Sequence, residues 1–172
     1  MILAICGLPG SGKTSLTTAL ARSIGAQVVC WDDYETMTQR TPDQIEDWLA
    51  RGAPFDEIAA PGLRERLSQI GETILFDGLL GPAWPNAADL ITQSIWLDCP
   101  ADIALARKLK QMLLEGGAEW ISQYLEVYPR VVSPALKLQQ LRVPPLCDYS
   151  LDANAPTATL VKHIEKQIFS NI

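Results

Sequence analysis

The segment GLPGSGKT at residues 7–14 places glycines, a lysine and a hydroxyl side chain at a fixed spacing. Gly7, Gly12, Lys13 and Thr14 satisfy the pattern GxxxxGK(S/T), in which backbone N–H groups turn inward around a phosphate. Lys13 can reach the β- and γ-phosphates as a point charge, and the Thr14 hydroxyl can ligate Mg²⁺. The pattern predicts a P-loop, with ATP and Mg²⁺ as cofactors. The expected nucleotide-binding residues are Gly7, Leu8, Pro9, Gly10, Ser11, Gly12, Lys13, Thr14 and Ser15.

Two further features of the sequence narrow the class of P-loop protein. Guanine-specific switches carry the pattern (N/T)KxD, and none of the six lysines here follows Asn or Thr. AAA-type and helicase ATPases place a water-activating Glu after the acidic residue that ends a strand, whereas Gly78 follows Asp77 in this chain. Both observations favour phosphoryl transfer to a bound acceptor over hydrolysis.

Carboxylates follow two of the expected strands. Asp32 and Asp33 come after the strand at 27–30, and Asp77 comes after the strand at 73–76. In open α/β sheets ligands bind outside the carboxyl ends of the strands, so these groups are expected beside the P-loop. A carboxylate there can accept a proton from an attacking hydroxyl or hold Mg²⁺ through water. A solvated acidic loop, or a structural role for Asp77, is the alternative, and the residues alone do not assign base and metal-side roles among the three.

The densest cationic cluster lies on a predicted helix at 101–115 and contains Arg107, Lys108 and Lys110. A mobile basic helix can close over a transferred phosphoryl group and stabilise its charge, although a solvated basic face is the alternative. The chain as a whole is acidic, with 14 basic and 20 acidic side chains and a net charge of −6. That balance argues against nucleic acid or an anionic membrane surface as a partner.

The elements that must position these groups alternate between strands and helices. Short apolar strands are expected at 2–6, 27–30, 73–76, 94–97 and 149–153, and helices at 13–24, 41–52, 62–71, 101–115, from near 118, and 157–169. Thr41, Pro42 and Gln44 form a capping box that starts one helix, and prolines at 129, 134 and 144–145 are expected to interrupt the chain before the last strand. The pattern predicts one domain of α/β class, a three-layer α/β/α P-loop NTPase with a parallel five-stranded sheet.

Cysteine usage and the N-terminal residues suggest a compartment. Four widely spaced cysteines contain no CxxC pair, and reduced, mostly buried thiols are the expected state. The start of the chain carries no cationic segment, and the apolar run ILAIC is too short for a signal sequence or a membrane span. A cytoplasmic protein is therefore expected.

The motifs GLPGSGKT, WDDY, LFDG and LDCPADIALARKLK, in this order, resemble the uridine kinase and nicotinamide riboside kinase group of P-loop nucleoside kinases. The segment EWISQYLEVY at 119–128 is similar to the stretch that follows the lid in nicotinamide riboside kinases. The resemblance implies Lys13, Asp33 and Arg107 as catalytic residues, with Asp33 as the base and Arg107 on a helical lid. It implies Thr14 and Asp77 as the metal-side residues. The implied substrate-binding residues are Asp32, Asp33, Tyr34, Phe55, Asp56 and Asp77, with Asp56 holding ribose hydroxyls.

The resemblance implies a single kinase domain over residues 1–172, with an acceptor-binding insertion at about 34–72 and a lid at about 100–117. The implied activity transfers the γ-phosphoryl group of Mg-ATP to a hydroxyl of a nucleoside-like small molecule, in a monomer or homodimer. Two alternatives remain open: a kinase of a sugar acid or vitamin alcohol, such as gluconate or pantothenate, and a regulatory nucleotide-binding protein with little turnover.

Departures from the family pattern bear on the acceptor. Uridine kinases carry a further arginine where Ala104 stands, and the segment from Tyr34 to Thr73 is too short for the hairpin that covers the base in those enzymes. Uridine itself is therefore disfavoured. Four aromatic side chains can either stack on a base or fill the core: Trp31, Tyr34, Phe55 and Trp84. His163, in the last predicted helix, is expected at the surface.

Overall fold

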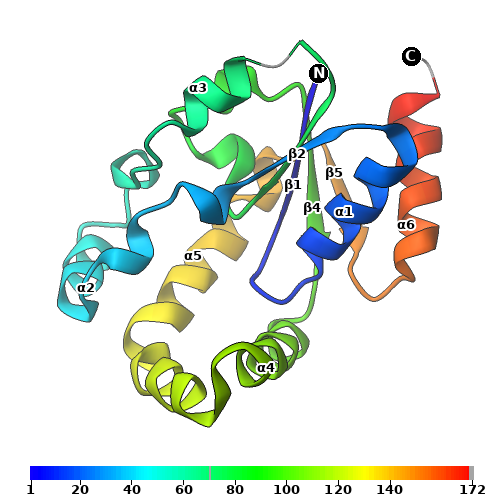
Figure 1. The fold of residues 1–172 in the computed structure, drawn as a ribbon. Helices are drawn as coiled ribbons and strands as arrows, with labels where there is room; N and C mark the ends of the chain where they lie inside the picture. The colour runs from blue at the N-terminus through cyan, green and yellow to red at the C-terminus, as the bar shows by residue number, and fades with distance from the viewer. Residues whose placement is uncertain (70, 171–172) are drawn as a thin grey trace.

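A computed structural model describes residues 1–69 and 71–170 of the protein. Its centre is a five-stranded parallel sheet of order β2-β3-β1-β4-β5 (Figure 1). The strands are β1 (Ile2–Gly7), β2 (Gln27–Cys30), β3 (Ile74–Gly78), β4 (Gln93–Asp98) and β5 (Tyr149–Asp152). β1 lies between β3 and β4. The strands β2 and β3 therefore lie on one side of β1 within the sheet, and β4 and β5 lie on the other. The predicted fold class is confirmed.

Helices cover both faces of the sheet, and the residues of β1 show why. Leu3 and Ile5 point into one core with residues of α1 (Lys13–Ile24) and α6 (Thr157–Ile164). Ile2, Ala4 and Cys6 point into the other core. Successive side chains of a strand alternate between faces, so a continuous apolar run is what a central strand requires. Figure 1 shows α1 and α6 together on one side of the sheet and α3 and α5 on the other.

α2 (Pro42–Ala50) begins with the predicted capping box, in which the Thr41 hydroxyl accepts from the N–H of Gln44 while the Gln44 side chain accepts from the N–H of Thr41. α3 (Leu63–Ser68) lies within the predicted helix at 62–71 and buries Leu63 and Leu67. Ile70, near the end of that predicted helix, lies outside the described residues.

The prediction for residues 101–142 was partly wrong. α4 (Ala101–Val127) is bent at Gly117, whose φ of 75° and ψ of −169° are not helical, so the predicted stop is a bend. Beyond it the chain stays helical through a π-helical segment (Tyr128–Val132) into α5 (Ser133–Arg142). Pro129 lies in the π-helical segment and Pro134 in α5, so both are inside this continuous helical stretch, where proline removes a backbone N–H and kinks a helix without necessarily ending it. Pro144 and Pro145 follow the end of α5, as predicted.

The cysteines, the histidine and the lengths of the helices complete the description of the fold. All four cysteines carry free thiols, with Cys6 and Cys99 buried and the other two half-buried. His163 is exposed. Across residues 1–69 and 71–170, no helix combines the length and apolar character needed to cross a bilayer.

Candidate functional site

The GLPGSGKT segment forms the loop between β1 and α1, as its pattern requires. Within it, the N–H of Ser11 donates to the carbonyl of Leu8 at 3.0 Å, which closes a tight turn. Gly10 has a φ of 84°, and a Cβ at this position would lie 2.1 Å from the carbonyl oxygen of Ala104 in α4. Only glycine permits both the left-handed backbone and this close approach. The tip of the loop therefore lies directly against the basic helix.

The start of α1 fits an anionic ligand. Gly12 precedes the helix with a φ of 97°, and in the described structure no side chain caps the first turn and no acidic residue lies in it. The first N–H groups of a helix lack intrahelical partners and carry the positive end of its dipole. An uncapped helix start behind a glycine loop is a phosphate-binding geometry. The residues present therefore fit the triphosphate of ATP.

Lys13 lies in the first turn of α1 with its Nζ 3.1 Å from the carbonyl oxygen of Leu8, to which it donates. Burial lowers the pKa of the Lys13 ammonium, while the nearby carboxylates of Asp77 and Asp32 oppose that shift. The ammonium group therefore lies between the phosphate loop and two acidic side chains, where a phosphate oxygen can replace the Leu8 carbonyl as its partner.

Thr14 and Asp77 are in direct contact although they lie on different elements. The Thr14 hydroxyl donates to Oδ2 of Asp77 at 2.6 Å, and Asp77 is 3% exposed. Burial raises the pKa of the Asp77 carboxyl, whereas the Thr14 hydrogen bond and the Lys13 charge lower it. A hydroxyl and a carboxylate at this distance, beside a phosphate cradle, suit Mg²⁺, which takes few protein ligands together with phosphate oxygens and water.

A cavity of about 570 Å³ opens beside the loop. Pro9, Gly10, Lys13 and Thr14 line one part of it, together with Asp32 from the short helical turn after β2. Asp33, which the family resemblance singles out as the base, does not line it. Cavities of this size hold small-molecule ligands in proteins.

Buried aromatic packing determines which of the two aspartates faces the cavity. Trp31 is 2% exposed, with its ring 4.9 Å from that of Trp84 and 6.5 Å from that of Phe76. This contact anchors the turn that carries Asp32 and Asp33. Trp84 is also buried and donates from Nε1 to the carbonyl of Ile58 at 3.0 Å. Trp84 is a core residue, while Trp31 belongs to the core and also to the cavity wall.

The other predicted acceptor residues separate in the structure. Phe55 lines the cavity and stacks on Trp48, with ring centroids 6.4 Å apart. Tyr34 and Asp56 lie outside the lining, and Asp56 accepts a hydrogen bond from Asn86 through its backbone carbonyl. Trp48 lines the cavity but was identified from the sequence only as part of an apolar helix stripe.

The cationic cluster on α4 also divides. The guanidinium of Arg107 donates to Oδ1 of Asn154 at 3.2 Å and to the thiol of Cys99 at 3.7 Å, so it reaches the turn after β5. Lys108 lines the cavity, whereas Lys110 is exposed and does not. Adjacent residues on a helix point about 100° apart, so one position decides which cation faces the site.

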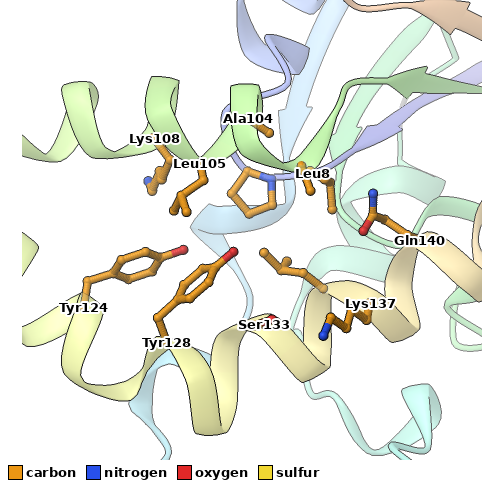
Figure 2. Close-up of a pocket in the computed structure, with 12 residues that line it drawn as sticks. Leu8, Ala104, Leu105, Lys108, Tyr124, Tyr128, Ser133, Lys137 and Gln140 are labelled. Atoms are coloured by element: carbon orange, nitrogen blue, oxygen red, sulfur yellow. The ribbon is translucent and has the colours of Figure 1, made fainter.

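A smaller pocket of about 90 Å³ adjoins the loop at Leu8, between α4 and α5. Figure 2 shows the rings of Tyr124 and Tyr128 below Lys108, with their hydroxyls pointing into this pocket. Their centroids are 5.5 Å apart, and burial raises the pKa of Tyr124 to about 12. Tyr124 therefore remains protonated near neutral pH and can donate a hydrogen bond.

Gln139 on α5 is a site residue that no sequence signal indicated. It is 4% exposed, lines the cavity, and donates from Nε2 to the carbonyls of Leu79 at 2.6 Å and Gly7 at 3.2 Å. These partners lie 60 and 132 residues away in the chain, so only the folded structure shows the contact.

A protein-family model described as an AAA domain matches residues 2–112, which is more than half of the chain. The chain belongs to the AAA domain family. The match runs from β1 into the first half of α4, and therefore includes the P-loop, both acidic turns and the cations of α4. In this AAA domain Gly78 follows Asp77, at the position where AAA-type ATPases place a water-activating Glu. The family match therefore does not restore that Glu.

A curated relative of this AAA domain is the shikimate kinase of Corynebacterium glutamicum, which is 25% identical over 117 residues. The match covers 62% of this chain and 63% of that protein, so the chain spans less than two thirds of the relative's length.

Solved structures show the fold. A shikimate kinase from Bacteroides thetaiotaomicron has a TM-score of 0.60 at 16% identity, with 98% of each chain covered. A deoxyadenosine kinase from M. mycoides with bound dATP has a TM-score of 0.59 at 13% identity, covering 99% of this chain and 100% of that chain. A gluconokinase from Sinorhizobium meliloti 1021 has a TM-score of 0.51 at 15% identity, covering 93% of this chain and 86% of that chain. The AAA domain thus has a P-loop kinase fold, and these neighbours do not single out the uridine kinase group.

Proposed function

We propose that this chain is an ATP-dependent kinase that transfers the γ-phosphoryl group of Mg-ATP to a hydroxyl of a small molecule. The observation that carries the proposal is the shared cavity: Lys13 and Thr14 of the P-loop line the same 570 Å³ space as Asp32 and the wall around Phe55. Phosphoryl transfer needs a donor site and an acceptor site within reach of each other. The shikimate kinase, deoxyadenosine kinase and gluconokinase that share this fold support the same reaction class.

On the donor side, the N–H groups of the loop and of the start of α1 hold phosphate oxygens, and Lys13 neutralises their charge. Thr14 and Asp77 would hold Mg²⁺, which would supply positive charge to offset the negative charge of the phosphates. Arg107, on the proposed lid at 100–117, contacts the turn after β5, and Lys108 is the lid cation that faces the cavity. Lys108 therefore supports the charge of the group in transfer.

On the acceptor side, Asp32 accepts the proton of the attacking hydroxyl. Its place in the cavity lining supports this role, whereas the family resemblance supports Asp33. The proposed acceptor-binding insertion at 34–72 contributes Ile45, Trp48 and Phe55 to the wall. A nucleoside-like acceptor is supported by this aromatic wall, and a sugar-acid acceptor by the fold shared with the gluconokinase.

The test is a measurement of ADP formation with Mg-ATP and a panel of nucleosides, sugars, sugar acids and vitamin alcohols. We expect at least one acceptor to stimulate ADP formation, and Lys13→Ala to abolish the stimulation. Lys162→Ala removes the same charge from α6, away from the site, and should leave the rate unchanged. ATP binding without stimulation by any acceptor would instead favour a regulatory nucleotide-binding protein.

A further inference from the structure

The part of the cavity away from the P-loop is apolar and aromatic. We define the acceptor wall as Met37, Ile45, Trp48, Phe55, Ile58 and Val131. These side chains come from four separate segments: the turn at 37–39, α2, the turn at 55–57 with Ile58 after it, and the π-helical segment before α5. Trp48 and Phe55 stack with an angle of 24° between their ring planes. The indole N–H of Trp48 donates a hydrogen bond to the carbonyl of Pro54 at 3.0 Å. The wall therefore offers ring faces and alkyl groups to a ligand.

The cations of the cavity lie at its phosphate side. Within the described residues, Lys13 and Lys108 are the two cationic side chains in the lining. Lys13 belongs to the P-loop, and Lys108 also lines the small pocket beside Pro9. The acceptor wall itself contains no Lys, Arg or His among those residues.

Two guanidiniums close to the wall are already engaged: Arg130 pairs with Glu46 at 2.6 Å and with Asp43 at 3.5 Å, and Arg142 is held behind Phe55. Arg142 lies 5.3 Å from the centroid of the Phe55 ring and donates to the carbonyls of Ala53 at 2.9 Å and Gly52 at 2.8 Å. Its side chain is not part of the cavity lining. It stabilises the position of Phe55 and offers no ion pair to a ligand in the cavity.

The acidic groups in the lining also disfavour an anion. Asp32 faces the cavity, and Asp77 lies behind Thr14. Glu35 lines the cavity as well, where its carboxylate accepts from the N–H of Thr38 at 3.2 Å and from the hydroxyl of Thr38 at 2.8 Å. A second carboxylate, brought by a ligand, would be desolvated near these negative charges, and the acceptor wall holds no cation to pair with it.

We propose that the acceptor is an electrically neutral alcohol with a mainly apolar or aromatic body, and that carboxylate-bearing sugar acids and vitamin acids are rejected. This inference rests on the proposed function, because it names the substrate class of the same cavity. A body of aromatic or alkyl surface packs on Trp48, Phe55 and Ile45, while its hydroxyl approaches Asp32.

Binding of a matched pair of probes tests the inference without requiring turnover. 2-Naphthalenemethanol and 2-naphthoate share a ring system and differ in charge. Calorimetric titration reports the binding of each probe in the presence of Mg²⁺ and a non-hydrolysable ATP analogue. We expect the alcohol to bind at least about tenfold more tightly than the carboxylate. Equal or tighter binding of naphthoate, or displacement of the alcohol by an equal concentration of shikimate or gluconate, would overturn the inference.

A charge added to the acceptor wall should invert this preference. Ile45 is half-buried on α2, so Ile45→Arg places a cation in the lining without emptying the core. We expect it to tighten naphthoate binding about tenfold and to weaken binding of the alcohol. Leu141→Arg is the matched control, because Leu141 is 70% exposed on α5 and outside the lining. If Ile45→Arg kept the wild-type preference for the alcohol over naphthoate, the assignment of the wall would be contradicted. The comparison of the two probes in the wild type does not depend on whether this variant folds.

The two proposals fail in different ways. Selective binding of the neutral probe, without any acceptor-stimulated ADP formation, would remove the kinase and leave a cavity for neutral ligands. Acceptor-stimulated ADP formation that is greatest with shikimate or gluconate would retain the kinase and overturn the neutral acceptor.

Discussion

The hydroxyl of Thr14 on α1 and the carboxylate of Asp77 at the end of β3 are joined by a hydrogen bond of 2.6 Å, across 63 residues of chain. This contact connects the start of α1 to the end of β3, and these are the two residues that would hold a magnesium ion. We expect Asp77→Asn to lower acceptor-stimulated turnover about 10²-fold or more. The variant should bind ATP without the increase in affinity that Mg²⁺ gives the wild type, which calorimetry with and without Mg²⁺ can measure. Asp47→Asn, an exposed change on α2, serves as the control; equal Mg²⁺ dependence in Asp77→Asn and the wild type would refute the metal role.

The cavity lining indicates Asp32 as the base, whereas the family resemblance indicates Asp33, and variants of the two residues distinguish these assignments. Asp32 lines the cavity and Asp33 does not, so Asp32→Asn should lower kcat about 10²- to 10⁴-fold with little change in ATP affinity. Asp33→Asn should change kcat less than threefold, because Asp33 lies outside the cavity lining and substitutions of surface residues usually have small effects. Steady-state kinetics of both variants decides between them, since the reverse ranking would assign the base to Asp33.

Gly10 should not tolerate a side chain. A Cβ there would meet the Ala104 carbonyl oxygen at 2.1 Å, on a backbone with φ of 84°. We expect Gly10→Ala to reduce the free energy of unfolding by about 1–3 kcal/mol and to weaken ATP binding, because the loop and α4 must separate. Denaturant unfolding and calorimetry measure the two effects. Gly71→Ala is the control, since nothing lies within 4 Å of its Cβ position; a wild-type affinity for ATP in Gly10→Ala would contradict the close packing.

Burial raises the pKa of the Asp77 carboxyl, so the folded state holds this proton more tightly than the unfolded chain does. As the pH rises from the ordinary aspartate value of about 3.9 through the raised pKa, the folded state therefore loses stability at this position. Asn is neutral throughout that range. The stability of Asp77→Asn relative to the wild type should consequently increase from pH 4 towards neutrality, which urea unfolding at several pH values can follow. A constant or shrinking difference would show that the Thr14 hydrogen bond and Lys13 outweigh burial.

The phosphate side of the site could be predicted because its residues belong to short segments of consecutive sequence. The loop, the start of α1 and the acidic end of β3 each follow from a short local pattern, and the alternation of strands and helices brings them to one edge of the sheet. The helical continuation through Pro129 and Pro134 was missed, since proline that kinks a helix looks the same in sequence as proline that ends one.

The acceptor side was harder, because tertiary packing decides which of two neighbouring residues faces a cavity. Trp31 is buried against Trp84, and the neighbouring Asp32 lines the cavity. In the same way, α4 contacts Gly10, and Lys108 of that helix lines the cavity. Adjacent residues of like charge carry no local signal that would distinguish them. The contacts of Arg107 with Asn154 and of Gln139 with Gly7 likewise join segments that are far apart in the sequence.

Gln139 has a consequence for the order in which ligands act. One amide nitrogen holds α5, the first residue of the phosphate loop and the segment after β3 together. Any shift of the loop on nucleotide binding is thereby transmitted to α5, next to the segment that carries Val131. Two sites joined in this way influence each other's affinity by the same factor in both directions. Nucleotide and acceptor should therefore bind cooperatively, and replacing Gln139 with Leu should weaken the coupling between their affinities.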